Sequence, residues 1–262
     1  VGLQNRPNPV YQHAYQFLRS RAAGSLVTDK GHWYENNSWR RPVGQPEFEE
    51  FLNWKLDADI SLGLLGEAGV HSFDNFLRHR SDFPAAVSSF GSIMKWRDGR
   101  AVEDVVSCIV EYADGFLSRF EASLANSFRQ KYYLVNGTEG SFLLQDARAW
   151  WFKEVDAPSL GWEVYASRER IGDEEGIVLL ADATQLLEKG FIPGQHREDS
   201  EAALEDDPLQ LAIEDFFNSI REGLPPAAGF REGHRSAVMA ILAHQALRRR
   251  ERLEIDPSSF EI

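Results

Sequence analysis

One stretch of the sequence brings a histidine and two carboxylates together at helical spacing. It reads Gly-Glu-Ala-Gly-Val-His-Ser-Phe-Asp, with Glu67 four residues before His71 and Asp74 three residues after it. On a helix, these three side chains can share one face. A carboxylate beside an imidazole orients the ring, selects its tautomer and stabilises its protonated form. Such a histidine suits a base that takes a hydroxyl proton while hydride leaves the same carbon atom.

Two other interpretations of this stretch stay open on the residues alone. A helical face of Glu, His and Asp is often a solvated or capped surface without any chemistry. Carboxylates and imidazole also bind zinc or manganese, although this spacing matches no dedicated metal motif. Gly66 and Gly69 allow backbone or ligand to approach closely where this helix begins.

The composition limits the kinds of partner. The chain has 262 residues with 28 Lys and Arg against 41 Asp and Glu, which gives a formal net charge of −13. This charge argues against nucleic acid or an anionic membrane surface and favours an uncharged or cationic small molecule, or another protein. The single cysteine, Cys108, lies in an apolar alternating run, so we expect a small buried hydrophobic residue and no disulfide or thiolate metal site.

The start of the chain and its apolar runs bear on its context. No apolar stretch approaches the roughly 20 residues of a membrane helix. The first residues have neither an initiator Met nor a signal-peptide pattern. We therefore expect a fragment, a processed product or an excised domain, with the cytoplasm as its compartment.

The elements that must position these residues follow from periodicity and turn signals. Asn8-Pro9 predicts the start of a helix that Gly24 closes. Asn36 to Asp59 is rich in Trp, Arg and Pro without periodicity, which indicates a long functional loop. Gly63 to Arg80 is expected to form one helix. Strands are expected at Leu26–Glu35, Ala86–Met94, Val105–Ser123 as a hairpin turning at Ala113–Gly115, Lys131–Val135 with Ser141–Leu144 as a second hairpin, and Ala149–Phe152.

The last third of the chain has a weaker pattern before two closing helices. From Glu163 to Asp207 periodicity fades, and His196 to Asp207 suggests an exposed loop. One helix is expected to open at Asp207-Pro208, and the other to run from Gly233 to Arg248. The side chains expected to face inward are Leu209, Ile213, Phe216, Phe217 and Ile220 on the first helix, and Val238, Ile241 and Leu242 on the second. Consecutive hairpins without βαβ alternation predict one α+β domain, residues 1–262, with a largely antiparallel open sheet and helices packed on one face.

Several segments, taken in order, make the chain similar to the C-terminal domain of the Gfo/Idh/MocA oxidoreductase family, which includes glucose–fructose oxidoreductase and inositol dehydrogenase. The segments that carry the resemblance are Val1–Arg6, Trp39–Pro42, Leu52–Leu56, Leu64–Asp74, Pro84 with Val87 and Gly91, Asp98–Arg100, Tyr112–Gly115, Asn136–Gly140, and the closing helix pair around Pro225-Pro226. Their order and spacing are more specific than any single segment. The resemblance implies an NAD- or NADP-dependent dehydrogenase that acts on a sugar or polyol.

The resemblance also assigns roles to individual residues. His71 matches the family's catalytic histidine, and Glu67 occupies the position of its acidic partner, where many members have Asp. Asp74 matches an acidic residue one turn later, with a supporting role. The residues that the resemblance implies as substrate binders are Arg6, His32, Trp39, Arg40 and Lys55. For Trp39 and Trp54, packing of the loop against the sheet is an equally good explanation.

Two hallmarks of the family are absent from the sequence. There is no Gly-x-Gly-x-x-Gly turn to seat a pyrophosphate, and no Glu-Lys-Pro motif. We therefore expect NAD or NADP to be bound mainly by an N-terminal Rossmann domain that is not part of this chain. Two alternatives stay open: an oligomerisation or carbohydrate-binding module without activity, which would use the open sheet face, and a relative that cleaves glycosides with transient use of nicotinamide.

Overall fold

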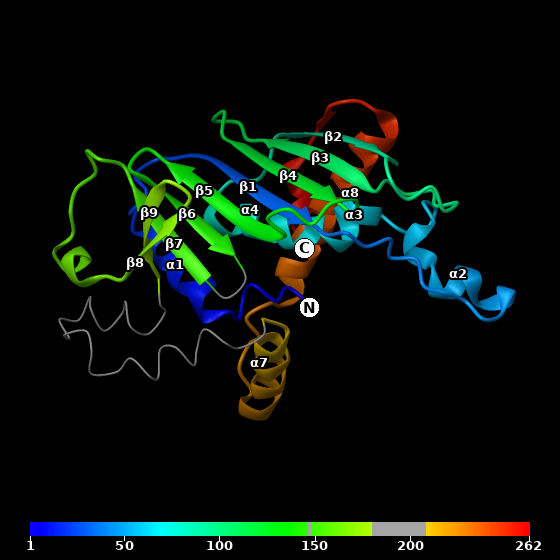
Figure 1. Ribbon diagram of the computed structural model, residues 1–262, viewed down its shortest axis with the longest axis horizontal. Coiled ribbons are helices and arrows are strands. Elements are labelled where there is room, and N and C mark those ends of the chain that lie inside the picture. Colours follow the sequence, from blue (N-terminus) through cyan, green and yellow to red (C-terminus); the bar gives the residue numbers. More distant parts are fainter. Residues whose placement is uncertain (146–147, 180–207) are drawn as a thin grey trace. The chain divides into compact units, whose positions relative to one another are not determined.

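The computed structural model describes residues 1–145, 148–179 and 208–262, which form two compact units. The first unit comprises Val1–Thr28 and Tyr133–Phe230, and the second comprises Asp29–Tyr132 and Arg231–Ile262. Both are built from antiparallel strands with helices against the sheet (Figure 1). The expected α+β class with an open, largely antiparallel sheet is confirmed. The expected loop from His196 to Asp207 lies outside the described residues.

The second unit contains the strand order β10-β2-β3-β4-β1. The strands are β1 (Leu26–Tyr34, in this unit from Asp29), β2 (Ala86–Ser92), β3 (Val105–Glu111), β4 (Leu117–Ser123) and β10 (Leu253–Glu254). The expected hairpin is confirmed: β3 pairs antiparallel with β4, and the turn has Gly115 at φ +88°. Cys108 is buried in β3, and burial raises the pKa of its thiol to about 12.

The first unit contains the order β5-β6-β7-β9-β8. The elements are α1 (Pro9–Arg19), β5 (Lys131–Gly137, in this unit from Tyr133), β6 (Gly140–Gln145), β7 (Arg148–Lys153), β8 (Arg168–Ile171) and β9 (Glu174–Val178). Helix α1 begins as expected, with the Asn8 side chain accepting from the amides of Val10 and Tyr11. Its Phe17 ring packs on Trp151 at 5.7 Å between centroids. The hairpin of β8 and β9 was not expected, because its residues are mostly charged and exposed and show no apolar alternation.

The long loop, the β7–β8 connection and the chain end each contain short helical turns. They are η1 (Pro46–Phe48), α2 (Glu49–Leu52), η2 (Trp54–Leu56), η3 (Gly161–Tyr165) and η4 (Pro257–Phe260). Within the described part of the chain, no helix has the length and apolar character needed to cross a membrane.

The helix expected from Gly63 to Arg80 is two helices. Helix α3 covers Gly63–Glu67 and α4 covers Gly69–His79, and the chain bends at Ala68, where φ is −107° and ψ −38°. Glycine on both sides of the bend weakens a continuous helix, because each costs about 1 kcal/mol relative to alanine. Glu67 and His71 therefore belong to different helices, and the expected four-residue spacing along one helical face does not apply.

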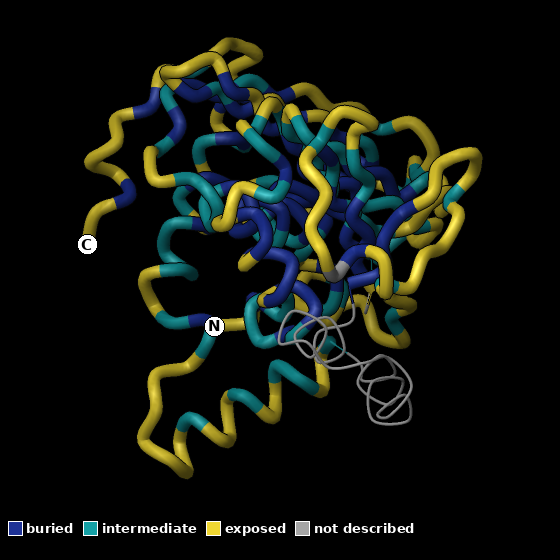
Figure 2. The backbone as a smooth tube through the Cα atoms, turned by 90° about the vertical axis from the view of Figure 1, so that its left-hand side faces the viewer, coloured by how far each residue is buried: buried dark blue, intermediate teal, exposed yellow. Residues whose placement is uncertain are grey.

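The two C-terminal helices are present, but their buried faces differ from the expectation. Helix α7 (Pro208–Glu222) has no buried residue, and its five apolar side chains expected to face inward are about half exposed (Figure 2). Helix α8 (Phe230–Arg249) buries Met239, Ala243 and Leu247, and Ile241 is exposed. The inward stripe of α8 combines small side chains, mostly alanines, with Met239 and Leu247.

Strand β1 presents different residues to its two faces because side chains alternate along a strand. Gly31 and Trp33 lie on the face covered by α4, whereas Lys30, His32 and Tyr34 lie on the other. At Gly31 the helix approaches so closely that an added Cβ would lie 2.5 Å from the Ser72 Cβ and closer still to its hydroxyl oxygen. This contact fixes the first turn of α4, which contains His71, against the strand.

We expect Gly31→Ala to destabilise the protein by about 1–3 kcal/mol, because the new methyl group cannot fit without moving α4 from β1. Thermal denaturation of the variant measures the loss. Gly44→Ala is the matched control, since nothing lies within 4 Å of a Cβ at that position. Adding Ser72→Gly to Gly31→Ala should restore much of the loss. A Gly31→Ala variant as stable as the control would contradict the close approach.

Candidate functional site

The imidazole of His71 is held by stacking. Its ring lies 5.6 Å from the Trp33 ring, centroid to centroid, with an interplanar angle of 16°. The Nδ1 atom is buried and has no hydrogen-bond partner among the described residues. A hydrogen bond to one ring nitrogen usually fixes the orientation of a functional histidine. In this chain the flat contact with an indole on a rigid strand supplies that orientation.

Burial and charge together set the protonation of His71. Burial lowers the pKa of the imidazole, and the Lys131 ammonium lowers it further, while the Glu67 carboxylate acts in the opposite direction. The net direction is downward from the ordinary value of 6.5, so the ring is neutral at pH 7. A neutral imidazole can accept a proton, which is the state that a general base requires.

Glu67 is bound to a lysine and not to the histidine. Its Oε2 atom lies 2.5 Å from Lys55 Nζ. The same ammonium lies 5.7 Å from the ring centroids of both Trp39 and Trp54. The expected hydrogen bond that would orient His71 through Glu67 is therefore not seen, because the bend at Ala68 separates the two residues onto different helices. Glu67 acts on His71 only through its charge.

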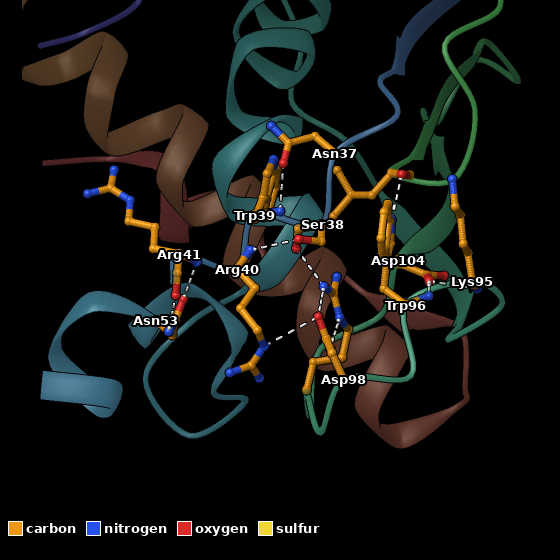
Figure 3. A network of polar contacts seen from close by, with 12 residues as sticks. Asn37, Ser38, Trp39, Arg40, Arg41, Asn53, Lys95, Trp96, Asp98 and Asp104 are labelled. Carbon is orange, nitrogen blue, oxygen red and sulfur yellow. Dashed lines mark hydrogen bonds and ion pairs between the residues drawn. The ribbon is translucent and has the colours of Figure 1, made fainter. Parts of the chain in front are cut away.

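The loop that carries Trp39 is fixed by local hydrogen bonds (Figure 3). The Asn37 side chain accepts from the Trp39 amide at 2.9 Å, and Trp39 Nε1 donates to Glu35 Oε1 at 2.5 Å. Trp39 has φ +61°, a left-handed conformation that is rare for a bulky residue. Backbone strain of this kind persists where the surrounding contacts over-determine the conformation, which is common at ligand sites.

Arg40 and Arg41, the next two residues of the loop, are held by side chains from other segments. The Asn53 side-chain oxygen accepts a hydrogen bond from the Arg41 amide at 2.7 Å, and the Asn53 side-chain nitrogen donates to the Arg41 carbonyl at 3.1 Å. Arg40 forms an ion pair with Glu49, and its Nε lies 3.4 Å from Asp98 Oδ2. Its guanidinium is thus already engaged by two carboxylates.

Arg100 connects the loop to Asp98. It donates to the Ser38 carbonyl at 2.5 Å and holds the Asp98 carboxylate with two nitrogens, at 2.7 and 2.8 Å. This forked contact lowers the pKa of Asp98 to about 2. Asp104, which is fully buried, accepts from three successive amides, those of Met94, Lys95 and Trp96. The segment of residues 94–100 is therefore a rigid support for the loop.

His32 lies on the opposite face of β1 from Trp33 and is not brought together with His71. Its Nδ1 lies 2.7 Å from Glu121 Oε1, its Nε2 lies 3.3 Å from the Phe128 carbonyl, and its ring stacks on Tyr34 and Tyr132 at 3.9 and 4.5 Å. Both ring nitrogens are thus engaged, as in a structural histidine.

The two remaining candidates, Asp74 and Arg6, have polar contacts of their own. Asp74 is buried, and its Oδ1 lies 3.5 Å from the hydroxyl of Ser236 on α8, in keeping with a supporting position. Arg6 belongs to the first unit, where its carbonyl accepts from the Gln12 side chain at 2.9 Å. The second unit thus brings together Glu67, Lys55 and Trp39, and it stacks His71 on Trp33.

Sequence reasoning missed Trp33 and Lys131 as residues of the site. Lys131 Nζ lies 3.7 Å from the centroid of the Trp33 ring. Strand alternation was the available signal for Trp33, because Gly31 marks the face that a helix approaches and Trp33 is two residues further on that face. Nothing in the sequence pattern places Lys131 near His71, because that contact depends on how the strands pair.

The described residues offer neither a metal site nor a dinucleotide site. Among the described residues, no three or more His, Cys, Asp or Glu side chains gather where they could bind a metal ion. The sequence has no Gly-x-Gly-x-x-Gly turn leading from a strand into a helix. The residues present therefore do not fit the pyrophosphate of a dinucleotide on their own.

Comparison with known proteins gives a consistent family match. Residues 11–143, just over half of the chain, match the model of the GFO/IDH/MocA C-terminal domain. No curated protein matches the chain. The structure is similar to levoglucosan dehydrogenase in complex with NADH and levoglucosan, with a TM-score of 0.67 and 17% identity over 98% of this chain and 66% of that chain.

Two further solved structures are similar over the same span. The complex of levoglucosan dehydrogenase with NADH and L-sorbose has a TM-score of 0.67 and 19% identity, over 98% of this chain and 65% of that chain. An oxidoreductase domain protein from Kribbella flavida has a TM-score of 0.65 and 19% identity, again over 98% and 65%. At these identities the likeness shows the fold, and this chain spans less than two thirds of the length of each structure.

We expect Asp98→Asn to lower the free energy of unfolding by about 1–2 kcal/mol at pH 7, because the amide loses the charged contact with Arg100. The folded pKa of about 2 lies below the ordinary value of 3.8. The contribution is therefore complete above pH 4 and is lost as the pH falls toward 2. Urea denaturation of both proteins at pH 7 and pH 3 should show the difference shrinking at the lower pH. An equal difference at both values would be inconsistent with this cause.

Proposed function

Because the chain belongs to the GFO/IDH/MocA family of oxidoreductases, we propose that it is the substrate-binding and catalytic-base part of a nicotinamide-dependent sugar or polyol dehydrogenase. The observation that carries the proposal is the His71 imidazole, which is kept neutral, stacked on Trp33, and placed on the unit that also holds Glu67, Lys55 and Trp39. The names of the solved relatives, which bind NADH with levoglucosan or L-sorbose, support this substrate class.

In the proposed reaction, His71 takes the proton of a secondary hydroxyl group. Its Nδ1 is buried, so we assign Nε2 to the substrate. The hydrogen on the same carbon departs with its electron pair, and the alcohol becomes a ketone. A bound nicotinamide ring supplies the hydride acceptor. The proton on His71 then passes to solvent, which returns the imidazole to its neutral form.

The loop residues would bind the sugar. Trp39 and Trp54 offer indole faces, on which the apolar face of a sugar ring can pack. Lys55 can donate hydrogen bonds to hydroxyl oxygens while Glu67 neutralises its charge. Arg40 is already paired with Glu49 and Asp98, so a contact with substrate would require exchange of one carboxylate. His32 and Asp74 are left as structural residues in this proposal.

The dinucleotide would be held mainly by a domain outside this chain. The absence of a phosphate-binding glycine turn and of a Glu-Lys-Pro motif supports this division. The choice between NAD and NADP depends on residues that contact the ribose, which in Rossmann domains lie beyond the first strand. The activity is therefore expected only in a polypeptide or complex that includes a nicotinamide-binding domain.

The test uses a polypeptide that carries this chain together with a nicotinamide-binding domain, assayed on a panel of sugars and cyclitols. We expect His71→Ala to reduce kcat by about 10²- to 10⁴-fold, the usual contribution of a general base. The control is His234→Ala, which removes an imidazole from α8. Unchanged turnover in His71→Ala would refute the assignment. Release of an aglycone from a model glycoside without net reduction of cofactor would indicate the glycoside-cleaving alternative.

We also propose that the chain forms a homo-oligomer through the open face of the sheet in the second unit. The face opposite α4 exposes Phe90, Ile109 and Leu117 on three adjacent strands, with exposed fractions of 65%, 39% and 40%. Apolar side chains gathered on one face of a sheet favour burial against another protein surface. A module that only associates or binds sugar would use the same face without turnover.

We expect Ile109→Asp to weaken the oligomer, because a carboxylate on this face would have to be desolvated when two copies associate. Size-exclusion chromatography with light scattering measures the change in mass. The control is Val155→Asp, which places the same charge at a fully exposed valine of the first unit. If both variants keep the mass of the unmodified protein, the oligomer does not use this face.

A further inference from the structure

The orientation of the His71 ring depends on its contact with Trp33, because no hydrogen bond holds the buried Nδ1. Rotation of a histidine ring about its side-chain bonds is normally limited by a hydrogen bond from the second nitrogen. Within the described residues, the one aromatic ring that stacks on the imidazole is the indole of Trp33, nearly parallel to it at 16°. Whatever holds the indole therefore also holds the imidazole.

The indole of Trp33 is in turn contacted by a cation. Lys131 Nζ lies 3.7 Å from the ring centroid, well within the 6 Å limit for a cation–π contact. Lys131, which is half-buried, thus fixes the plane against which His71 stacks.

Lys131 differs from the other lysines near the two faces of β1. Lys55 is paired with Glu67 and Lys30 with Glu121, each at 2.5 Å. Within the described ranges, Lys131 forms no ion pair, so its charge is not neutralised by a carboxylate. The other charged groups around His71 are Glu67 on α3, which is paired with Lys55, and Asp74 on α4 itself, which is directed to Ser236 on α8.

We infer that Lys131, acting through Trp33, is a positioning residue that holds the His71 imidazole in place and in its neutral form. The ammonium anchors the indole, and the indole sets the plane of the imidazole. A proton on His71 would bring a second positive charge close to Lys131, so the neutral ring is favoured. The catalytic meaning of this inference rests on the proposed function, but the physical effect does not.

The pKa of His71 can be measured on this chain alone by NMR titration of the histidine ring protons. The His71 signal is identified by its loss in His71→Gln. We expect Lys131→Met to raise the pKa of His71 by about half a unit or more, as expected for removal of a nearby like charge. Lys131→Arg keeps the charge and should leave the pKa near that of the unmodified protein.

The matched control is Lys30→Met, which removes the same charge from the opposite face of β1. It should leave the pKa of His71 unchanged, because Lys30 is paired with Glu121 on that other face. An unaltered His71 pKa in Lys131→Met, or an equal rise in Lys30→Met, would overturn the inference. If Lys131→Met does not fold, as judged by circular dichroism, Lys131→Gln takes its place with the same expected result.

A second measurement separates this inference from the proposed function. In the polypeptide with a nicotinamide-binding domain, Lys131→Met should move the acidic limb of the kcat/KM profile to higher pH, with little change in kcat on the alkaline plateau. Trp33→Leu should lower kcat even on that plateau, because the imidazole loses its stacking surface. A shifted NMR pKa with no dehydrogenase activity in the unmodified protein would retain the inference and reject the proposed function.

Discussion

The contact of α4 with β1 at Gly31 determines the geometry of the candidate site. A hydrogen atom in place of a side chain lets Ser72 approach the strand backbone, and the first turn of α4 follows it inward. Phe73, one residue further, reaches the ring of Phe120 on β4 at 5.6 Å. Two adjacent residues of one helix thus fix its distance from two strands. His71, the residue before them, is carried onto Trp33 as a consequence.

Much of the fold could be predicted from the sequence because its signals are local. The Asn8-Pro9 start of α1 and the turn at Gly115 are each set by the chemistry of a few neighbouring residues. The hairpin of β8 and β9 could not be predicted in this way, since β8 is mostly exposed and neither strand shows apolar alternation. The inward face of α8 was also misjudged, because packing favoured alanine where hydrophobicity alone favoured isoleucine.

The sequence predicted which residues belong to the site, but it did not predict the contacts between them. Spacing in the sequence identified His71, Glu67 and Asp74, but it assumed an unbroken helix. The bend at Ala68 gives each acidic residue a different partner, namely Lys55 for Glu67 and Ser236 for Asp74. Those partners lie 12 and 162 residues away along the chain. Contacts of such sequence separation depend on tertiary packing, and no local pattern encodes them.

Because side chains alternate along β1, neighbouring residues of this strand lie on opposite faces of the sheet. His32 is engaged with Glu121 on one face, and Trp33 supports His71 on the other. A single-residue insertion before His32 would exchange the two faces, because a shift of one position inverts every side chain of a strand. Substitutions along this strand can therefore alter one surface independently of the other, whereas changes in its length alter both at once. In evolution, this strand should accept replacements far more readily than insertions or deletions.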